Sequence, residues 1–300
     1  MTFSARLKDE IAAIKVNTIE ARIELYALLR FDGKFDKNKI SITLENASIA
    51  RRIYKHIKEL FNINIKVIVR NQKRFRIKQI YILEINEKVE LIKKSLDIKS
   101  NYIETKEDMI SFLRGAFLAT GSISDPSTSG YHLEFVFHRI TDARIVDDIL
   151  KGFKFDSKIL KRSNRYMVYI KSAEEISDVI KLLGAINSLF YFEDIRIYRD
   201  HKNMVNRLNN CEIANQEKSL TTGMRQVEYI NYLKDNDLMS LLDDNGKIVC
   251  EYRLKYPESS YSELAEIISL ETSYKIGKSG VNHNFIKVKN LVNKHKNMAK

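Results

Sequence analysis

Two stretches of nine residues decide how this chain folds: LYALLRFDG at Leu25–Gly33 and LRGAFLATG at Leu113–Gly121. Each closes a largely apolar segment, at 18–31 and at 108–120, whose spacing of apolar residues predicts a helix. Each ends in glycine, which suits a left-handed stop after a helix. Small side chains in these segments would let the two helices pack closely against each other. The small residues are Ala27, Gly115, Ala116 and Ala119.

The same order of predicted elements follows both glycines. Alternating or β-rich segments predict strands, and helical spacing of apolar residues predicts helices. The first copy has strands at 40–44, 63–70 and 76–85 and helices at 47–61 and 87–96. The second copy has strands at 131–137, 153–160 and 165–170 and helices at 142–150 and 173–183. The sequence therefore predicts an α+β fold with a tandem repeat, at 1–103 and 104–200.

Both nine-residue stretches resemble the motif that names the LAGLIDADG homing endonucleases. The resemblance implies two sheets that form a saddle over duplex DNA, with an acidic residue at the eighth position of each motif to hold divalent metals. The eighth positions here are Asp32 and Thr120. A symmetric metal site needs carboxylates from both copies, and a threonine hydroxyl cannot replace one. We therefore expect no catalytic residue, no metal and no cofactor, and helices that only pack the repeats together. The alternative is a metal-dependent DNA endonuclease with an asymmetric site around Asp32.

The end of the chain has a different character. Residues 272–300 contain seven lysines and no acidic residue. Before them, Ser260-Tyr261-Ser262-Glu263 is a capping box, which starts a helix. Helical patterns cover 225–240, 247–255, 261–269 and 279–294, with Pro257 as an interruption. Two short helices with the basic one second are typical of a helix-turn-helix that reads DNA, so an all-α domain is predicted at 223–300.

The last predicted helix has two different sides. Val281, Phe285, Val288 and Val292 follow helical spacing and predict one buried stripe. Asparagine can bond an adenine edge, lysine can contact guanine or phosphate, and backbone N–H groups at a helix start can bind phosphate. The alternative is a solvated basic side that contacts nothing. The predicted DNA-binding residues are Lys278, Ser279, Gly280, Asn282, His283, Asn284, Lys287 and Lys294.

Two further segments carry a second resemblance. The block from Asn203 to Asn215 and the run Lys278–His283 resemble signature stretches of the WhiA family. That resemblance covers nearly the whole chain and implies a bacterial regulator that binds DNA without cutting it, in sporulation or in cell division and chromosome segregation. It also implies protein partners in transcription or cell division. Gly277 and Asn284 depart from the usual serine and arginine of the family, which leaves the DNA target open.

Two more clusters have a functional and a structural interpretation. No acid occurs between Glu59 and Glu84, where a basic hairpin is predicted that either contacts phosphates or is only solvated. Its cations are Lys66, Arg70, Lys73, Arg74, Arg76 and Lys78. An Asn-rich linker is predicted at 201–222, and its asparagines either satisfy backbone groups or contact a partner. The linker residues to which these two alternatives apply are Asn206, Arg207, Asn210 and Asn215.

Composition sets the remaining expectations. A formal net charge of +12 favours a polyanionic partner, double-stranded DNA above all. Two cysteines cannot make a disulfide framework, and no residues show the spacing of a metal cluster. The sequence has no signal-like start and no apolar stretch long enough to span a membrane. We therefore expect a cytoplasmic, nucleoid-associated protein that does not bind membranes.

Overall fold

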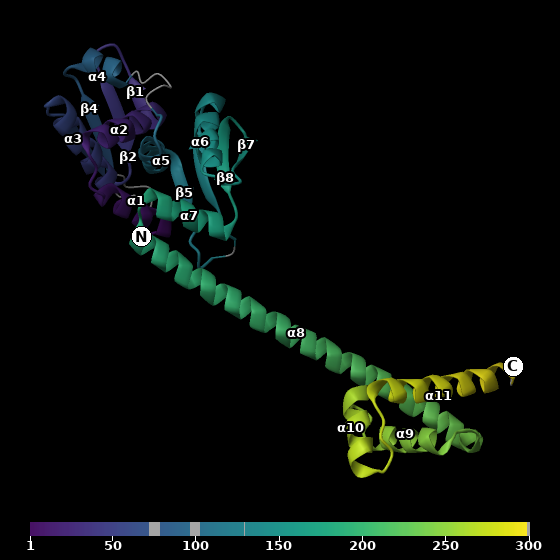
Figure 1. Ribbon diagram of the computed structural model, residues 1–300. Helices are drawn as coiled ribbons and strands as arrows, with labels where there is room; N and C mark the ends of the chain where they lie inside the picture. The colour runs from purple at the N-terminus through teal and green to yellow at the C-terminus, as the bar shows by residue number, and fades with distance from the viewer. Residues whose placement is uncertain (72–78, 97–102, 129, 299–300) are drawn as a thin grey trace. The chain divides into compact units, whose positions relative to one another are not determined.

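The computed structural model describes residues 1–71, 79–96, 103–128 and 130–298. The chain forms two compact units, Met1–Arg199 and Asp200–Lys300. Each unit has its own apolar core. Figure 1 shows the helices and strands of both units.

The first unit contains two copies of one α+β motif. The first copy consists of α1 (Phe3–Ala13), α2 (Thr18–Asp32), β1 (Gly33–Phe35), β2 (Ile40–Leu44), α3 (Ala47–Phe61), β3 (Lys66–Asn71), β4 (Gln79–Ile85) and α4 (Val89–Leu96). The second consists of α5 (Lys106–Thr120), β5 (Gly121–Ile123), β6 (Leu133–Phe137), α6 (Ile140–Gly152), β7 (Lys158–Arg162), β8 (Arg165–Ile170) and α7 (Ala173–Leu183). The tandem repeat is confirmed. The predicted strand at 153–160 was wrong in its first half, because the strand begins only at Lys158.

The two sheets have the same topology. Their strand orders are β1-β2-β4-β3 and β5-β6-β8-β7, and all pairs are antiparallel. Gly33 lies opposite Ile42, and its counterpart Gly121 lies opposite Phe135. Each motif helix therefore leads directly into the edge strand of its own sheet. The helix α1 was not predicted, although Phe3, Leu7 and Ile11 place three buried side chains on one side of it.

The helices α2 and α5 pack against each other, and small residues make this possible. A Cβ atom on Gly115 would lie 2.5 Å from the carbonyl oxygen of Glu24 and 2.8 Å from the Cβ of Ala27. Only a residue without a side chain fits at this crossing, so the predicted close approach is confirmed at Gly115.

The predicted left-handed stop after each motif helix was wrong. Gly33 has φ −79° and Gly121 has φ −74°, which any residue can adopt. Glycine is needed there for space instead. A Cβ on Gly33 would lie 2.4 Å from the carbonyl oxygen of Leu29, and one on Gly121 would lie 2.2 Å from a ring carbon of Phe117.

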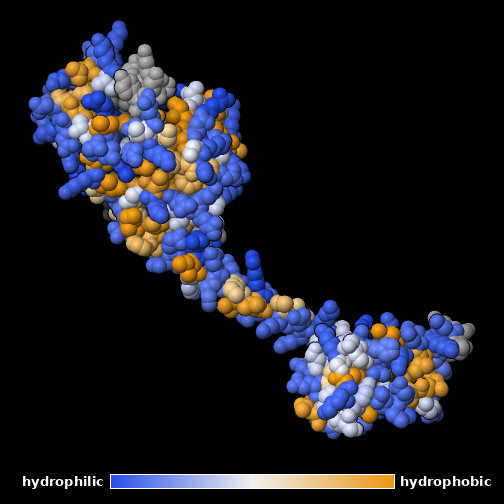
Figure 2. All heavy atoms as spheres, viewed as in Figure 1, coloured by the Kyte–Doolittle hydropathy of each residue, from blue (hydrophilic) through white to orange (hydrophobic). Residues whose placement is uncertain are grey.

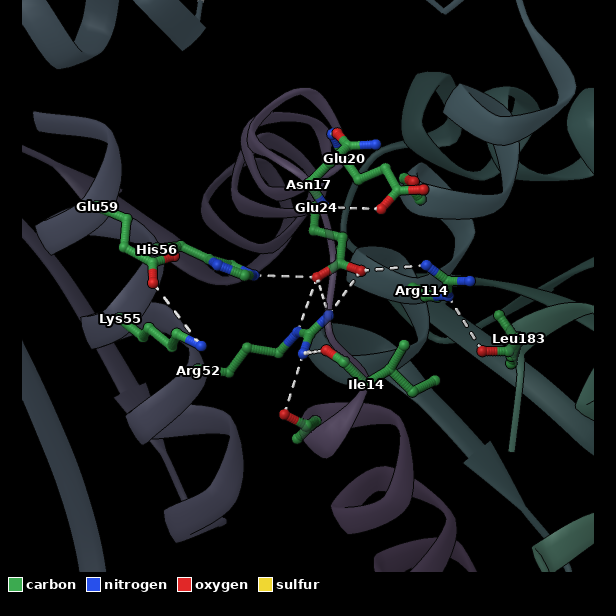
Figure 3. Close-up of polar contacts among 12 residues, drawn as sticks. Ile14, Asn17, Glu20, Glu24, Arg52, Lys55, His56, Glu59, Arg114 and Leu183 are labelled. Carbon is green, nitrogen blue, oxygen red and sulfur yellow. Dashed lines mark hydrogen bonds and ion pairs between the residues drawn. The ribbon is translucent and has the colours of Figure 1, made fainter. Parts of the chain in front are cut away.

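A buried polar cluster around Glu24 joins elements of both copies (Figure 3). Arg52 of α3 donates from Nε and Nη2 to the two carboxylate oxygens of Glu24, at 2.8 and 2.9 Å. His56 Nε2 lies 3.1 Å from the same carboxylate, and Arg114 Nη1 of α5 lies 3.7 Å from it. Arg114 also donates from Nε to the carbonyl of Leu183. The cluster balances buried charge inside the unit.

In its described residues the second unit consists of helices joined by turns. It contains most of α8 (Ile186–Asp235), a 3-10 helix at Leu238–Leu241, α9 (Asp244–Lys255), α10 (Tyr261–Glu271) and α11 (Lys278–Met298). A helix was predicted at 225–240, but α8 ends at Asp235 and runs without a break through the predicted linker at 201–222. That part of α8 is almost fully exposed, and it includes the apolar side chains of Met204, Leu208 and Ile213. Figure 2 shows such apolar side chains among polar ones along α8.

The core of the second unit contains the predicted stripe. Val281, Phe285, Val288 and Val292 are all buried, with at most 4% of their surface exposed. They pack with side chains of α8, α9 and α10 in one cluster. The capping box at Ser260 and Glu263 starts α10 as predicted. The second unit is therefore a helix-turn-helix domain in which α11 is the second helix.

Candidate nucleic-acid interface

The side of α11 opposite the core is open to solvent. The turn before it, at 272–277, is closed by Ser269, whose hydroxyl bonds both the N–H and the carbonyl of Ile276. Gly280 is partly buried, because a Cβ there would lie 2.7 Å from the Ile276 side chain. The predicted side chains that are exposed on α11 are Lys278, Ser279, Asn282, His283, Lys287 and Lys294.

The expectation that Asn284 contacts DNA was wrong. Its side chain is only 6% exposed, and its Nδ2 donates to the carbonyl of Gly280 at 3.0 Å. A Cβ on Gly246 of α9 would lie 3.7 Å from its Oδ1, so α9 covers this position. The side chain of Asn284 therefore bonds within the first turns of α11 and does not lie on the exposed surface of that helix.

The two predicted lysines beyond the first turn of α11, Lys287 and Lys294, differ in their surroundings. Lys287 Nζ lies 3.0 Å from Oδ2 of Asp243, the N-cap residue of α9. Bonds from Lys287 and from the N–H of Gly246 lower the pKa of the Asp243 carboxyl. Lys294 has no such counter-ion among the described residues. The charge of Lys287 is partly balanced inside the domain, and that of Lys294 is available to a partner.

The outer surface of the first sheet carries part of the predicted basic strip. Lys66 and Arg70 share one side of β3, and Lys66 lies opposite Glu84 of β4. Lys39 donates to Glu84, and this bond lowers the pKa of the Glu84 carboxyl. Four members of the strip, Lys73, Arg74, Arg76 and Lys78, lie outside the described residues. In the second sheet Arg162 lies opposite Arg165 at the β7–β8 turn, so both outer surfaces carry cations near a hairpin end.

The positions that would hold a metal in a LAGLIDADG enzyme do not fit one here. Thr120 Oγ1 donates to the carbonyl of Ala116 at 3.0 Å, so this hydroxyl stays within its own helix. Asp32 lies at a hollow of about 570 Å³ that Lys8 of α1 also lines. Partial burial raises the pKa of Asp32 to about 6, and the nearby positive charge of Lys8 opposes this shift. The residue as a whole remains exposed to solvent. Thr120 therefore offers no carboxylate opposite Asp32, and Lys8 places a positive charge beside the one carboxylate that these two positions provide.

Lys8 lies beside Asp32, and the sequence interpretation did not identify it. Its Nζ donates to the carbonyl of Leu118 at 3.3 Å, near the end of α5. Burial lowers the pKa of Lys8 to about 8, against the opposing charges of Asp32 and Glu45. The spacing of Phe3, Leu7 and Ile11 could have revealed the helix. Nothing local could have placed Lys8 beside Asp32, since the two lie on different elements.

The predicted linker residues lie on the exposed part of α8. Asn215 donates from Nδ2 to Cys211 Sγ at 3.7 Å. In the part of the chain that the structure describes, Asn206, Arg207 and Asn210 have no side-chain hydrogen bond or ion pair. Their alternative roles stay predictions. Of the helices described, none combines the length and the apolar character that a membrane crossing needs.

Comparison with known proteins gives three family matches in the order of the domains. Residues 18–99 match the WhiA N-terminal LAGLIDADG-like domain, and residues 109–202 match the WhiA LAGLIDADG-like domain. Residues 205–292 match the WhiA C-terminal HTH domain. The fold is therefore two LAGLIDADG-like domains followed by a helix-turn-helix domain.

Relatives match over nearly the full length. The chain is 36% identical to the "Probable cell division protein WhiA" of Bacillus cytotoxicus, over 98% of this chain and 97% of that protein. It is also 36% identical to the protein of the same name from Staphylococcus aureus strain Newman, over 99% of this chain and 98% of that one. The crystal structure of full-length DUF199/WhiA from Thermatoga maritima has a similar fold, with a TM-score of 0.60 and 22% identity over 98% of this chain and 99% of that chain. This chain belongs to the WhiA family.

Proposed function

We propose that the protein is a sequence-specific regulator that binds double-stranded DNA through α11 and has no nuclease activity. Its proposed roles are cell division and chromosome segregation, as the names of its relatives and the WhiA resemblance suggest. The same proposal includes control of transcription, and in some relatives control of sporulation. The place of action is the nucleoid in the cytoplasm, where the protein meets DNA and its partners in transcription or cell division.

One observation carries the proposal. The exposed side of α11 presents Asn282, His283 and Lys294 and no acidic residue, and its other side is fixed in the core by four apolar residues. Residues in the first turn of a recognition helix reach base edges, and lysines further along meet phosphates. Asn282 would therefore supply base readout, and Lys294 would supply affinity that depends on charge alone.

The experiment compares two variants of the full chain. A target is first selected from a pool of random duplexes, and binding to the target and to a scrambled duplex is then measured over a salt series. Asn282→Ala should reduce the preference for the target by about 1–3 kcal/mol. Lys294→Ala should weaken binding to both duplexes equally and reduce the salt slope by about one unit.

A matched control for the first variant is Asn297→Ala, which lies in the last turn of the same helix and should leave the preference unchanged. Equal weakening of both duplexes by Asn282→Ala would mean that α11 does not read bases there. A loss confined to the target in Lys294→Ala would mean that the helix docks in another orientation.

The alternative function, a metal-dependent endonuclease built on Asp32, is tested separately. Plasmid incubated with the protein and Mg²⁺ or Mn²⁺ should stay supercoiled, because Thr120 supplies no carboxylate and Lys8 places a cation beside Asp32. Nicking that disappears in Asp32→Asn would establish the endonuclease instead.

A further inference from the structure

Arg253 of α9 is a buried cation without a carboxylate partner. It is 1% exposed. Its Nη1 donates to the carbonyls of Tyr256, Pro257 and Ser259, at 3.2, 3.3 and 2.6 Å. Its Nε is buried and has no hydrogen-bond partner. Among the described residues no acidic side chain forms an ion pair with it, and burial lowers its pKa. The rings of Tyr261 and Phe285 lie 6.0 and 5.5 Å from its guanidinium carbon, so carbonyls and aromatic faces surround the charge and no carboxylate of the described residues balances it.

Arg253 lines a hollow of about 500 Å³, and two lysine side chains line the same hollow. Lys218 reaches it from α8, and Lys278 reaches it from the first turn of α11. Both lysines are exposed, and neither has an ion pair in the described ranges. The residues that line this hollow include Asn215, Thr222 and Ser262 but no acid. Three positive side chains with amide and hydroxyl groups between them form a site suited to an oxyanion.

The start of α10 opens onto the same hollow. Ser260 and Tyr261, its N-cap and first residues, line it together with Ser262. The capping box uses the N–H groups of Ser260 and Glu263, whose partners lie within the box. The N–H groups of the first helical turn and the helix dipole favour an anion at this end. An adjoining hollow is lined by four glutamates, Glu212, Glu217, Glu258 and Glu263, which restricts an anion to the side where Lys218 and Lys278 lie.

We propose that this hollow, formed by Arg253, Lys218, Lys278 and the start of α10, binds one backbone phosphate of the duplex that α11 reads. The inference rests on the proposed function and adds a second point of contact to it. Lys278 is the first residue of α11, so a phosphate in the hollow belongs to a strand already next to that helix. Phosphate contacts of this kind fix the register of a helix in the groove. Asn215 of the Asn-rich block lines this hollow and would contact the phosphate, whereas Asn206 and Asn210 do not line it.

The test uses Lys218→Gln in the full chain, because Lys218 is exposed and its loss leaves the core intact. Binding to a fluorescent duplex is measured by anisotropy over a salt series. Loss of one phosphate contact should reduce the salt slope by about 0.9 and weaken target and scrambled duplexes equally. The matched control is Lys202→Gln, an exposed lysine on the same helix that does not line the hollow. An unchanged slope in Lys218→Gln overturns the proposal.

A second measurement locates the phosphate. Single phosphodiesters of the duplex are replaced in turn by neutral methylphosphonates. At one position the replacement should weaken the wild-type protein as much as Lys218→Gln does, and it should weaken that variant no further. Full additivity at every position would overturn the assignment to the DNA backbone. A second outcome would also overturn it: inorganic phosphate stabilises the protein in a way that depends on Lys218, but the salt slope for DNA binding does not depend on Lys218.

The two proposals fail in different ways. If Asn282→Ala and Lys294→Ala leave binding unchanged while Lys218→Gln reduces the salt slope, α11 is not the reading helix and the phosphate site stands by itself. If the α11 variants behave as proposed and Lys218→Gln matches Lys202→Gln, only the phosphate site is wrong.

Discussion

Two buried arginines, Arg52 in the first unit and Arg253 in the second, both donate hydrogen bonds to backbone carbonyls. They differ in whether a carboxylate balances their charge. Arg52 donates from Nη1 to the carbonyls of Ala12 and Ile14, much as Arg253 donates from Nη1 to three carbonyls of the loop after α9. Arg52 has in addition the carboxylate of Glu24, which accepts two of its N–H groups. Arg253 has none among the described residues. A carboxylate of the same unit balances the charge of Arg52, whereas Arg253 lies among carbonyls and aromatic rings at the hollow where we propose that an anion binds.

The same difference extends to neighbouring cations. In the first unit Arg30 lies 2.9 Å from Asp142, and Lys8 lies within the field of Asp32 and Glu45. In the second unit Lys218 and Lys278 line a hollow without acids. Removing one partner of a buried pair is costly because it leaves the other charge uncompensated, whereas cations without a carboxylate partner at a hollow can attract an anion.

The largest effect is expected where a buried charge loses its partner. Glu24→Gln should lower the free energy of unfolding of the first unit by about 3–5 kcal/mol, because it leaves Arg52 and Arg114 without a counter-charge. The measurement is chemical denaturation of the full chain, followed by a probe in the first unit. Glu59→Gln, which removes an exposed partner of Lys55, should change stability by less than about 1 kcal/mol. A small effect of Glu24→Gln would show that the cluster does not balance charge as described.

A smaller effect is expected where a buried charge is removed altogether. Arg253→Gln should cost about 1–2 kcal/mol in the second unit, because it frees carbonyls but leaves no charge unpaired. The measurement is denaturation in a chloride buffer without phosphate, with Lys247→Gln on the same helix as a control. A cost as large as that of Glu24→Gln would remove the distinction between the two arginines.

The pH dependence of Asp32 tests the charge balance of the first unit further. Its pKa in the folded protein is raised to about 6 from 3.8, so the folded state binds more protons than the unfolded state between these values. Stability from this group is present below about pH 4 and is lost as the pH rises through about 6. Because the group is partly exposed, the loss should be at most about 1 kcal/mol. Subtracting the pH profile of Asp32→Asn from that of the wild type isolates it, and a difference that rises with pH contradicts the assignment.

The smallest effect concerns the one lysine of the α11 surface with a counter-ion. Asp243→Asn keeps an N-cap residue of equal quality and removes the charge beside Lys287. Binding to any duplex should become tighter by less than about 1 kcal/mol at low salt, since the pair is exposed. Asp244→Asn, one residue further and without contact to α11, should have a smaller effect. Equal effects of the two variants would mean that only net charge matters.

Local pattern explains which predictions were confirmed. The buried stripe of α11 follows from helical spacing, and the two motif helices follow from their apolar runs and small residues. Asn284 was misplaced because it lies next to the stripe on the helix surface. Whether such a position is covered depends on Gly246 of α9, which lies far away in the sequence. The continuous helix α8 was divided because an asparagine-rich composition resembles a linker, although it contains no proline.

By itself, the sequence determined the repeat, most of its helices and strands, and the sidedness of α11, because periodicity and small residues act within one helix or strand. Only the tertiary structure decided which charges are balanced. Glu24 meets Arg52 and Arg114 from three different helices, and Arg253, Lys218 and Lys278 line one hollow from three different helices. Whether a buried cation has a carboxylate or an open hollow beside it depends on how distant helices pack, and no local pattern carries that information.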